Sequence, residues 1–176
     1  MSQVRPGRTA AVSLPLLAFA LACDTDGPAA ISAPDVPASA SLSLEPLTCA
    51  TTETTTDTFT VDGAGATFTH GKHRIVVPAG AVDVPTEIEY TVPASSVVEI
   101  RVRANGQEHF TFAEPLSITI SYARCPLSLT ELLPLVAWYW DPATGVLLEA
   151  MPSTDDKDDR SVTFSTDHFS GYVIAN

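Results

Sequence analysis

The chain has 176 residues, of which 21 are acidic and 9 are Lys or Arg, so its formal net charge at pH 7 is −12. That length is typical of one domain rather than several, and the acidity disfavours nucleic acid as a partner. With 45% hydrophobic residues the chain is too apolar to be disordered throughout, and 3 cysteines are too few for a disulfide-rich scaffold.

The N-terminal segment has the composition of an export signal. Arg5 and Arg8 precede an uncharged apolar run over residues 10–22, which is shorter than the roughly 20 residues of a membrane-spanning helix. The run ends in Phe-Ala-Leu-Ala-Cys23, which resembles the lipobox of bacterial lipoproteins. The resemblance implies that a lipoprotein signal peptide, residues 1–22, is removed and that Cys23 is acylated, which anchors the chain to membrane lipid without spanning it. The alternative is an ordinary signal peptide with an incidental cysteine.

Residues 24–56 have the composition of a flexible linker. They consist mainly of Ala, Ser, Pro, Thr and Asp, with 5 acidic residues, no basic residue and no aromatic residue. Such a segment buries too little apolar area to order itself, and its charges repel one another. We therefore expect residues 23–56 to form a lipidated cysteine and a disordered acidic tether that holds a domain away from the membrane.

From residue 57 to the end of the chain, apolar and polar residues alternate. In one example, Ile88, Tyr90 and Val92 share a face, and Glu87 and Glu89 share the other. The same period of two recurs in segments 98–103, 116–122, 162–165 and 172–174. Turn residues separate these segments, and prolines lie at their ends, where a missing N–H does little harm. The pattern predicts an all-β fold, with residues 57–176 forming a single antiparallel β-sandwich domain.

Two local elements can be predicted between these segments. The sequence Asp-Pro-Ala-Thr-Gly at residues 141–145 is a turn signal, so residues 138–140 and 146–148 are expected to form a hairpin. The only candidate for a helix is a segment of one or two turns at residues 127–133.

Four motifs of this domain share a pattern of turns and strands with a known family. They are residues 73–92, which contain Pro-Ala-Gly-Ala at 78–81, then Phe-x-x-Pro-Leu-Ser-Ile-Thr-Ile at 112–120, Trp-Tyr-Trp-Asp at 138–141 and His-Phe-Ser-Gly-Tyr at 168–172. This pattern resembles the ZU-five domain of ankyrins, zonula-occludens proteins, netrin receptors and bacterial envelope proteins. The resemblance covers about residues 60–176 and implies a β-sandwich that serves as an interaction or spacer module, not as an enzyme.

The tripeptide His168-Phe169-Ser170 is the sharpest candidate for chemistry. Some eukaryotic ZU-five proteins cleave themselves within such a tripeptide, which by resemblance makes His168 the base, Ser170 the nucleophile and the Phe169–Ser170 bond the target. Cleavage would release only the 7 residues 170–176. The residues therefore favour the alternative, in which His168 and Ser170 fix the start of the last strand and Phe169 packs in the core.

Two cysteines, Cys49 and Cys125, remain once Cys23 is acylated. In an oxidising compartment two remaining cysteines often pair. The bond would close a loop of 76 residues and tie the end of the tether to the domain. The alternative is two free thiols.

An acidic cluster, Asp155, Asp156, Asp158 and Asp159, lies in an expected hairpin loop. Clustered carboxylates suit calcium, but the run lacks the glycine and the alternating spacing of an EF-type loop, so a solvated turn that blocks strand pairing is favoured. The four histidines, His70, His73, His109 and His168, have no Cys or acidic partner at a ligand spacing. We expect no metal site and no cofactor.

Trp138 and Trp140 lie on one face of an expected strand, and Tyr139 lies on the other. Exposed, two aligned indoles could stack on a sugar ring. Buried, they would form the heart of a sandwich core, and the apolar residues 135–137 favour burial.

These observations predict a lipid-anchored, exported protein of the bacterial cell envelope, facing the periplasm or the surface. Its β-sandwich would bind an envelope protein or a polysaccharide, or serve a structural role, without enzymatic activity. Two alternatives stay open. They are the same fold with autoproteolysis at Phe169–Ser170, and a carbohydrate-binding module that uses Trp138 and Trp140.

Overall fold

A computed structural model describes residues 44–129 and 134–176 of the chain. The predicted signal peptide, Cys23 and the tether as far as residue 43 lie outside these ranges. Residues 130–133, the end of the predicted helix, lie outside them too. The described start of that segment is a short 3-10 helix at Leu127–Leu129. Among the described residues, no helix has the length and apolarity that crossing a membrane requires.

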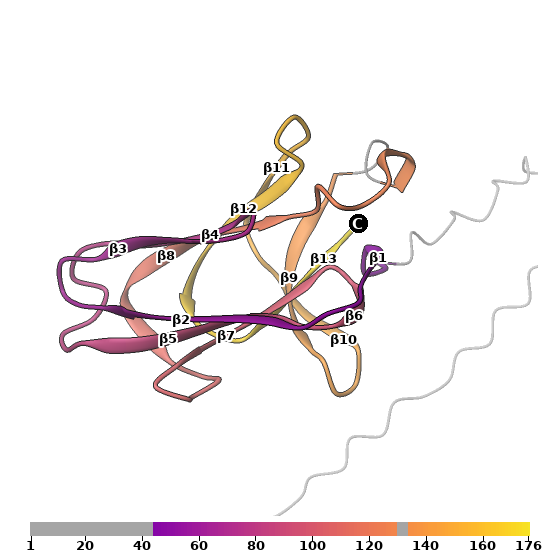
Figure 1. Cartoon of the computed structure of the whole chain (residues 1–176). Coiled ribbons are helices and arrows are strands. Elements are labelled where there is room, and N and C mark those ends of the chain that lie inside the picture. Colours follow the sequence, from indigo (N-terminus) through magenta and orange to yellow (C-terminus); the bar gives the residue numbers. More distant parts are fainter. Residues whose placement is uncertain (1–43, 130–133) are drawn as a thin grey trace, which may run out of the picture. The chain divides into compact units, whose positions relative to one another are not determined.

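The described residues form an all-β, antiparallel sandwich, as the alternating pattern predicts (Figure 1). One sheet has six strands in the order β10-β9-β13-β7-β5-β2, the other has five in the order β11-β12-β8-β4-β3, and β1 pairs with β6 in a separate ribbon. Their bounds are β1 Thr48–Thr51, β2 Thr55–Val61, β3 Ala66–His70, β4 His73–Val77, β5 Thr86–Val92, β6 Ser95–Val97, β7 Glu99–Ala104, β8 Thr111–Ser121, β9 Val136–Asp141, β10 Val146–Ala150, β11 Ser153–Asp156, β12 Ser161–His168 and β13 Gly171–Ala175.

The core lies between the two large sheets, because each strand turns its apolar residues inward. Ile88 and Tyr90 of β5 are buried, whereas Glu87 and Glu89, which alternate with them, are not. From the opposite sheet, Ile118 and Ile120 of β8 are wholly buried. The predicted hairpin at the Asp-Pro-Ala-Thr-Gly turn is also confirmed, since β9 pairs with β10 across it.

The turn motif Pro-Ala-Gly-Ala at residues 78–81 packs against the loop that joins β2 to β3. The Gly80 amide donates to the Gly63 carbonyl oxygen over 2.9 Å. Gly65 has a φ of +73°, and a Cβ built on it would lie 2.5 Å from the Val77 carbonyl oxygen. Only glycine can occupy such a position, so the close approach of two backbone segments requires it.

The predicted boundary of the tether at residue 56 is wrong, because residues 44–56 belong to the folded domain. Pro46 forms a bridge with Ala175 at the end of the chain, and the Leu47 amide donates to the Ile174 carbonyl oxygen over 2.7 Å. Leu47 and Cys49 are each only 8% exposed. The segment is poor in apolar residues, but backbone hydrogen bonds to β13 and β6 order it. Amino-acid composition alone cannot predict such hydrogen bonds.

Candidate functional site

A disulfide joins Cys49 in β1 to Cys125 in the segment after β8, with the two Cα atoms 5.4 Å apart. Two arginines support this junction. Arg124 donates to the Cys49 carbonyl oxygen over 3.3 Å, and Arg160 donates to the Cys125 carbonyl oxygen. The first strand is thus fastened covalently to the sandwich, and two of the 3 cysteines in the sequence are bonded to each other.

The His168-Phe169-Ser170 tripeptide forms the junction between β12 and β13. The Tyr172 hydroxyl donates to the His168 carbonyl oxygen over 2.6 Å, which is the kind of tyrosine corner found in other β-sandwiches. Phe169 is wholly buried against the edge of Phe112, with ring centroids 4.6 Å apart. Burial is the main cause that raises the pKa of Tyr172 and keeps its phenol protonated.

The structure does not bring the side chains of His168 and Ser170 together. The His168 Nδ1 atom lies 3.1 Å from a carboxylate oxygen of Asp167 and 3.4 Å from the Thr166 hydroxyl. The hydrogen bond from His168 lowers the pKa of Asp167. Among the hydrogen bonds of the described residues, none joins the imidazole to the Ser170 hydroxyl, and the Ser170 carbonyl oxygen accepts from the Val102 amide over 3.1 Å. This is a hydrogen-bonded strand junction.

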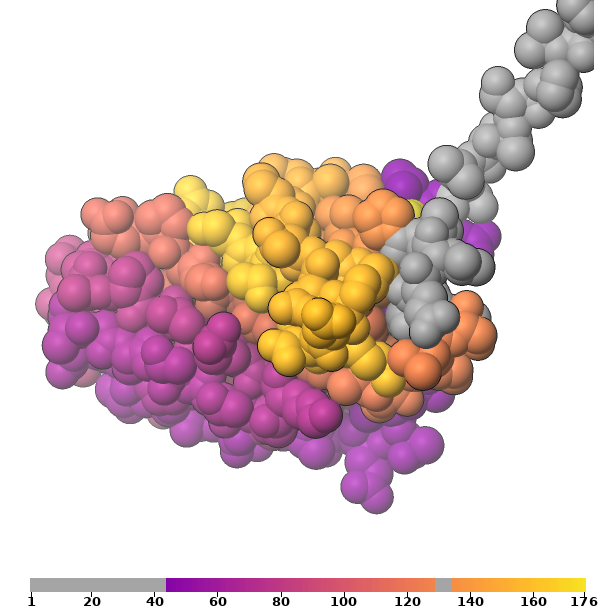
Figure 2. All heavy atoms as spheres, turned by 90° about the horizontal axis from the view of Figure 1, so that it is seen from above, coloured from indigo at the N-terminus to yellow at the C-terminus, as the bar shows by residue number. Residues whose placement is uncertain are grey.

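Two carboxylates of the acidic cluster hold the β11–β12 hairpin and its neighbours in place. Asp155 accepts from the Tyr122 hydroxyl over 2.6 Å and from the Leu135 amide over 2.8 Å, and it pairs with Lys157. Asp156 accepts from the amides of Asp158 and Asp159 within the turn. Burial first, and then the bond to Asp155, raise the pKa of Tyr122. Atoms of this part of the chain, in yellow-orange, cover part of the surface seen from above in Figure 2.

Neither Trp138 nor Trp140 belongs to the core between the sheets, so their expected position is wrong, although Trp140 is buried as expected. Ala137 and Tyr139 are the residues of β9 that face the core, opposite Ile174 and Tyr172 of β13. Trp138 and Trp140 therefore lie on the outer face of the six-stranded sheet, where Trp138 is opposite Val173. Trp140 is still only 8% exposed, whereas Trp138 is half-buried. Alternation correctly places both indoles on one face, but it does not say which face is inward.

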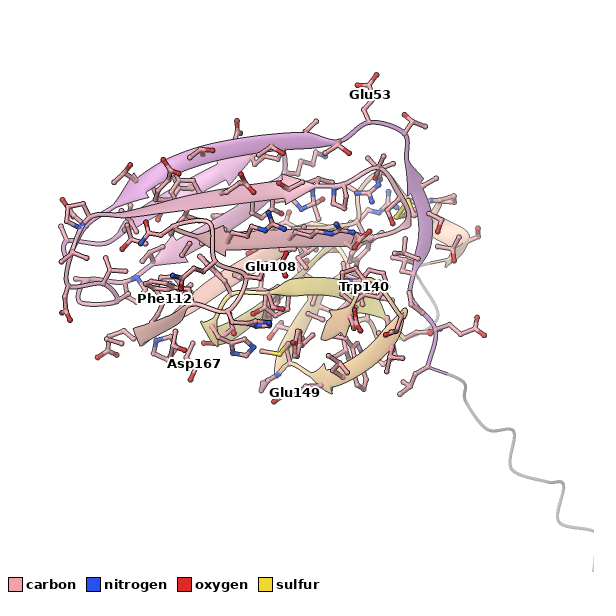
Figure 3. The ribbon with its side chains drawn as sticks, turned by 90° about the horizontal axis from the view of Figure 1, so that it is seen from below. Glu53, Glu108, Phe112, Trp140, Glu149 and Asp167 are labelled. Atoms are coloured by element: carbon pink, nitrogen blue, oxygen red, sulfur yellow. A yellow bond between two sulfur atoms is a disulfide. The ribbon has the colours of Figure 1, made fainter. Side chains whose placement is uncertain are left out.

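A pocket of about 310 Å³ opens beside Trp140 on this outer face. Arg101, Arg103, Glu108 and His109 line it together with Trp140. Figure 3 shows Trp140 and Glu108 on the same side of the six-stranded sheet, seen from below. The indole nitrogens of Trp138 and Trp140 are buried without a hydrogen-bond partner among the described residues. The pocket thus combines an aromatic wall with charged donors and acceptors.

A polar cluster around His70, which the sequence spacing does not reveal, lies where the edges of the two sheets meet. Thr55 and Asp57 belong to β2, the edge of the six-stranded sheet, and His70 ends β3, the edge of the other sheet. The His70 Nε2 atom lies 2.8 Å from the Thr55 hydroxyl, and its Nδ1 atom pairs with Asp57. His70 therefore has an acidic partner 13 positions away in the chain, a pairing that the sequence spacing does not reveal.

No described group of three or more His, Cys, Asp or Glu side chains is close enough to hold a metal ion. No protein-family model matches the chain, and no curated protein matches it. The likeness to the ZU-five domain therefore rests on the four motifs.

Proposed function

We propose that the chain is a lipid-anchored protein of the bacterial cell envelope whose ZU-five-like β-sandwich is a non-enzymatic binding or structural module. The observation that carries this proposal is the disulfide between Cys49 and Cys125. Disulfides persist in exported proteins and are rare in the cytosol. The bond also accounts for two of the 3 cysteines and leaves Cys23, after the apolar run, for acylation.

Metabolic labelling with an alkyne fatty acid, followed by cell fractionation, tests the anchor. We expect the labelled protein in the membrane fraction, and we expect Cys23→Ser to be unlabelled. Cys49→Ser is the matched control, because it also replaces one cysteine by serine and should keep the label. A wild-type protein that is soluble and unlabelled would overturn the proposal.

The proposed module is not self-cleaving. Support comes from the partners of His168, whose imidazole is bonded to Thr166 and Asp167, and from the burial of Phe169. Intact mass measurement after denaturation should give a single uncleaved species, both for the wild type and for Ser170→Ala. A fragment ending at Phe169 in the wild type, absent from the variant, would establish cleavage.

A second candidate function, carbohydrate binding, is favoured by the pocket beside Trp140. Sugars are often held by an aromatic side chain with charged hydrogen-bonding groups around it, which is the composition of this lining. The chain has 2 tryptophans, Trp138 and Trp140, and both lie on this face, so tryptophan fluorescence, excited selectively over tyrosine, reports on it alone. Titration with envelope polysaccharide fragments should change the emission saturably, and Arg101→Ala should weaken the response. An emission unchanged at millimolar sugar would reject this candidate.

A further inference from the structure

A cleft of about 570 Å³, lined in part by His70, lies at the open edge of the sandwich. Its walls come from the turn between β3 and β4, the start of β2, the end of β5 and the segment after β8. Four of its lining residues carry or can carry positive charge, and we call it the basic cleft after them. They are His70, Lys72, His73 and Arg124.

The charge of the basic cleft is opposite to that of the chain as a whole. No Asp or Glu lines it, although the chain has 21 acidic residues and 9 Lys or Arg. Asp57 lines the adjoining cavity and pairs with the imidazole of His70, so it offsets positive charge on His70 only. Lys72 is exposed and forms no ion pair within the described ranges, and Arg124 uses one nitrogen to reach the Cys49 carbonyl oxygen. Two full positive charges are thus left for a ligand.

Neutral hydrogen-bond donors lie beside these charges. The Nδ1 atom of His73 accepts from the Ser121 amide over 3.2 Å. Because a neutral imidazole has one acceptor and one donor, Nε2 of His73 carries the proton. Burial, with Arg124 and His70 adding to it, lowers the pKa of His73 to about 4, so the ring is neutral at pH 7.

Tyr90 is a second neutral donor, and it lies in the adjoining cavity, which it lines together with His70 and His73, rather than in the wall of the basic cleft itself. Its side chain is 2% exposed, yet its hydroxyl has no hydrogen-bond partner among the described residues. The ring lies 5.9 Å from that of His73 and 5.5 Å from that of His70, centroid to centroid. Burial raises the pKa of Tyr90, and the nearby charge of Arg124 opposes that effect. An unsatisfied buried hydroxyl is energetically unfavourable, and an acceptor on a ligand would satisfy it.

We propose that the basic cleft binds a phosphate group, to which Lys72 and Arg124 supply charge and His73 and Tyr90 supply neutral hydrogen bonds. Lys72 and His73 are neighbours in the chain, and Arg124 and Tyr90 belong to two other segments. Donors from three segments suit the tetrahedral oxygens of phosphate better than the flat oxygen pair of a carboxylate. The proposal is independent of the lipid anchor and of the pocket beside Trp140. The phosphate could belong to a soluble phosphate ester or to a lipid headgroup, and the experiment separates these sources.

Isothermal titration of the full chain with inorganic phosphate, at constant ionic strength, tests the cleft. We expect saturable binding at one site and a loss of roughly tenfold in affinity in Lys72→Ala, because a charge-assisted hydrogen bond is removed. Lys157→Ala is the matched control, since Lys157 is the other lysine of the chain and lies in the β11–β12 turn. Tyr90→Phe should also weaken phosphate binding while leaving the stability of the fold undiminished. Absence of saturable binding, or an equal loss in both lysine variants, would overturn the proposal.

Flotation with vesicles separates the two sources of phosphate. The Cys23→Ser form of the full chain is mixed with vesicles that contain phosphatidylglycerol, with and without glycerol phosphate as a competitor. Vesicle binding that glycerol phosphate abolishes identifies a headgroup, and glycerol phosphate binding without flotation identifies a soluble ester. Vesicle binding that neither glycerol phosphate nor Lys72→Ala reduces would contradict a role for the cleft.

Discussion

Cys49 is bonded through sulfur to Cys125, 76 positions later in the chain, and this bond fastens β1 to the segment that follows β8. The strand is short, and its partner β6 has three residues. The covalent bond therefore contributes to order that the backbone ladder alone would support weakly. It also lies next to Arg124, so it fixes one wall of the basic cleft.

Removal of the disulfide should destabilise the domain. For a loop of 76 residues, the chain-entropy relation gives a loss of about 4 kcal/mol in the free energy of unfolding. Urea unfolding of the Cys49→Ser, Cys125→Ser double variant against the oxidised wild type measures this difference. Addition of a reductant should lower the stability of the wild type toward that of the variant and leave the variant unchanged. Equal stabilities of oxidised wild type and variant would show that the bond contributes nothing.

The fold should become less stable as the pH is lowered, because of His73. Unfolded His73 gains its proton near pH 6.5, whereas burial delays protonation in the folded state to about pH 4. Between these values the unfolded state binds more protons, so the contribution is full above pH 6.5 and is lost as the pH falls to 4. The loss amounts to roughly 3 kcal/mol at most. Urea unfolding at several pH values should give a shallower dependence for His73→Gln than for the wild type, and parallel curves would contradict the burial of this ring.

Tyr172→Phe should destabilise the fold by about 1–2 kcal/mol, because the hydroxyl is buried and bonded. It donates to the His168 carbonyl oxygen over 2.6 Å and lies 3.0 Å from the Thr166 hydroxyl. The matched control is Tyr90→Phe, whose lost hydroxyl has no partner among the described residues, so that stability should be equal or higher. Thermal unfolding of the two variants compares them directly. A larger loss of stability for Tyr90→Phe than for Tyr172→Phe would contradict the assignment of the hydrogen-bonded hydroxyl to Tyr172.

Gly65→Ala should cost about 3 kcal/mol or more, because the added Cβ would lie 2.5 Å from the Val77 carbonyl oxygen and 2.6 Å from the Pro78 carbonyl carbon. Both are backbone atoms and cannot move aside cheaply. Gly106→Ala is the control. Its φ of +74° is similar, but nothing lies within 4 Å of its Cβ position, so it should lose only about 1 kcal/mol. Denaturant unfolding that gives equal losses would mean that the contact with residues 77–78 is absent.

The parts of the fold that could be predicted from sequence are those set by local periodicity. The alternation in residues 86–92 identifies β5 and its buried face, and the turn at residues 141–145 identifies the β9–β10 hairpin. The cysteine pair could be proposed because the predicted acylation of Cys23 would leave two cysteines. Each of these features could be predicted without knowledge of which distant segments lie together in the fold.

The features that could not be predicted depend on contacts between distant segments. Residues 44–56 are ordered by hydrogen bonds to β13, at the opposite end of the chain, so their composition misleads. The outward position of Trp138 follows from its register opposite Val173, and a period of two does not distinguish inside from outside. His70 and Asp57 meet only because β2 and β3 form the edges of different sheets.

The intact mass of the protein extracted from membranes with detergent tests the central claim most directly. A lipid anchor at Cys23 requires a mass equal to residues 23–176 plus a diacylglycerol or a larger acyl modification, with Cys49 and Cys125 oxidised. The same measurement on Cys23→Ser should show no lipid. A wild-type mass that fits an unmodified chain, recovered from the soluble fraction with free thiols, would contradict the anchor and the oxidising compartment together.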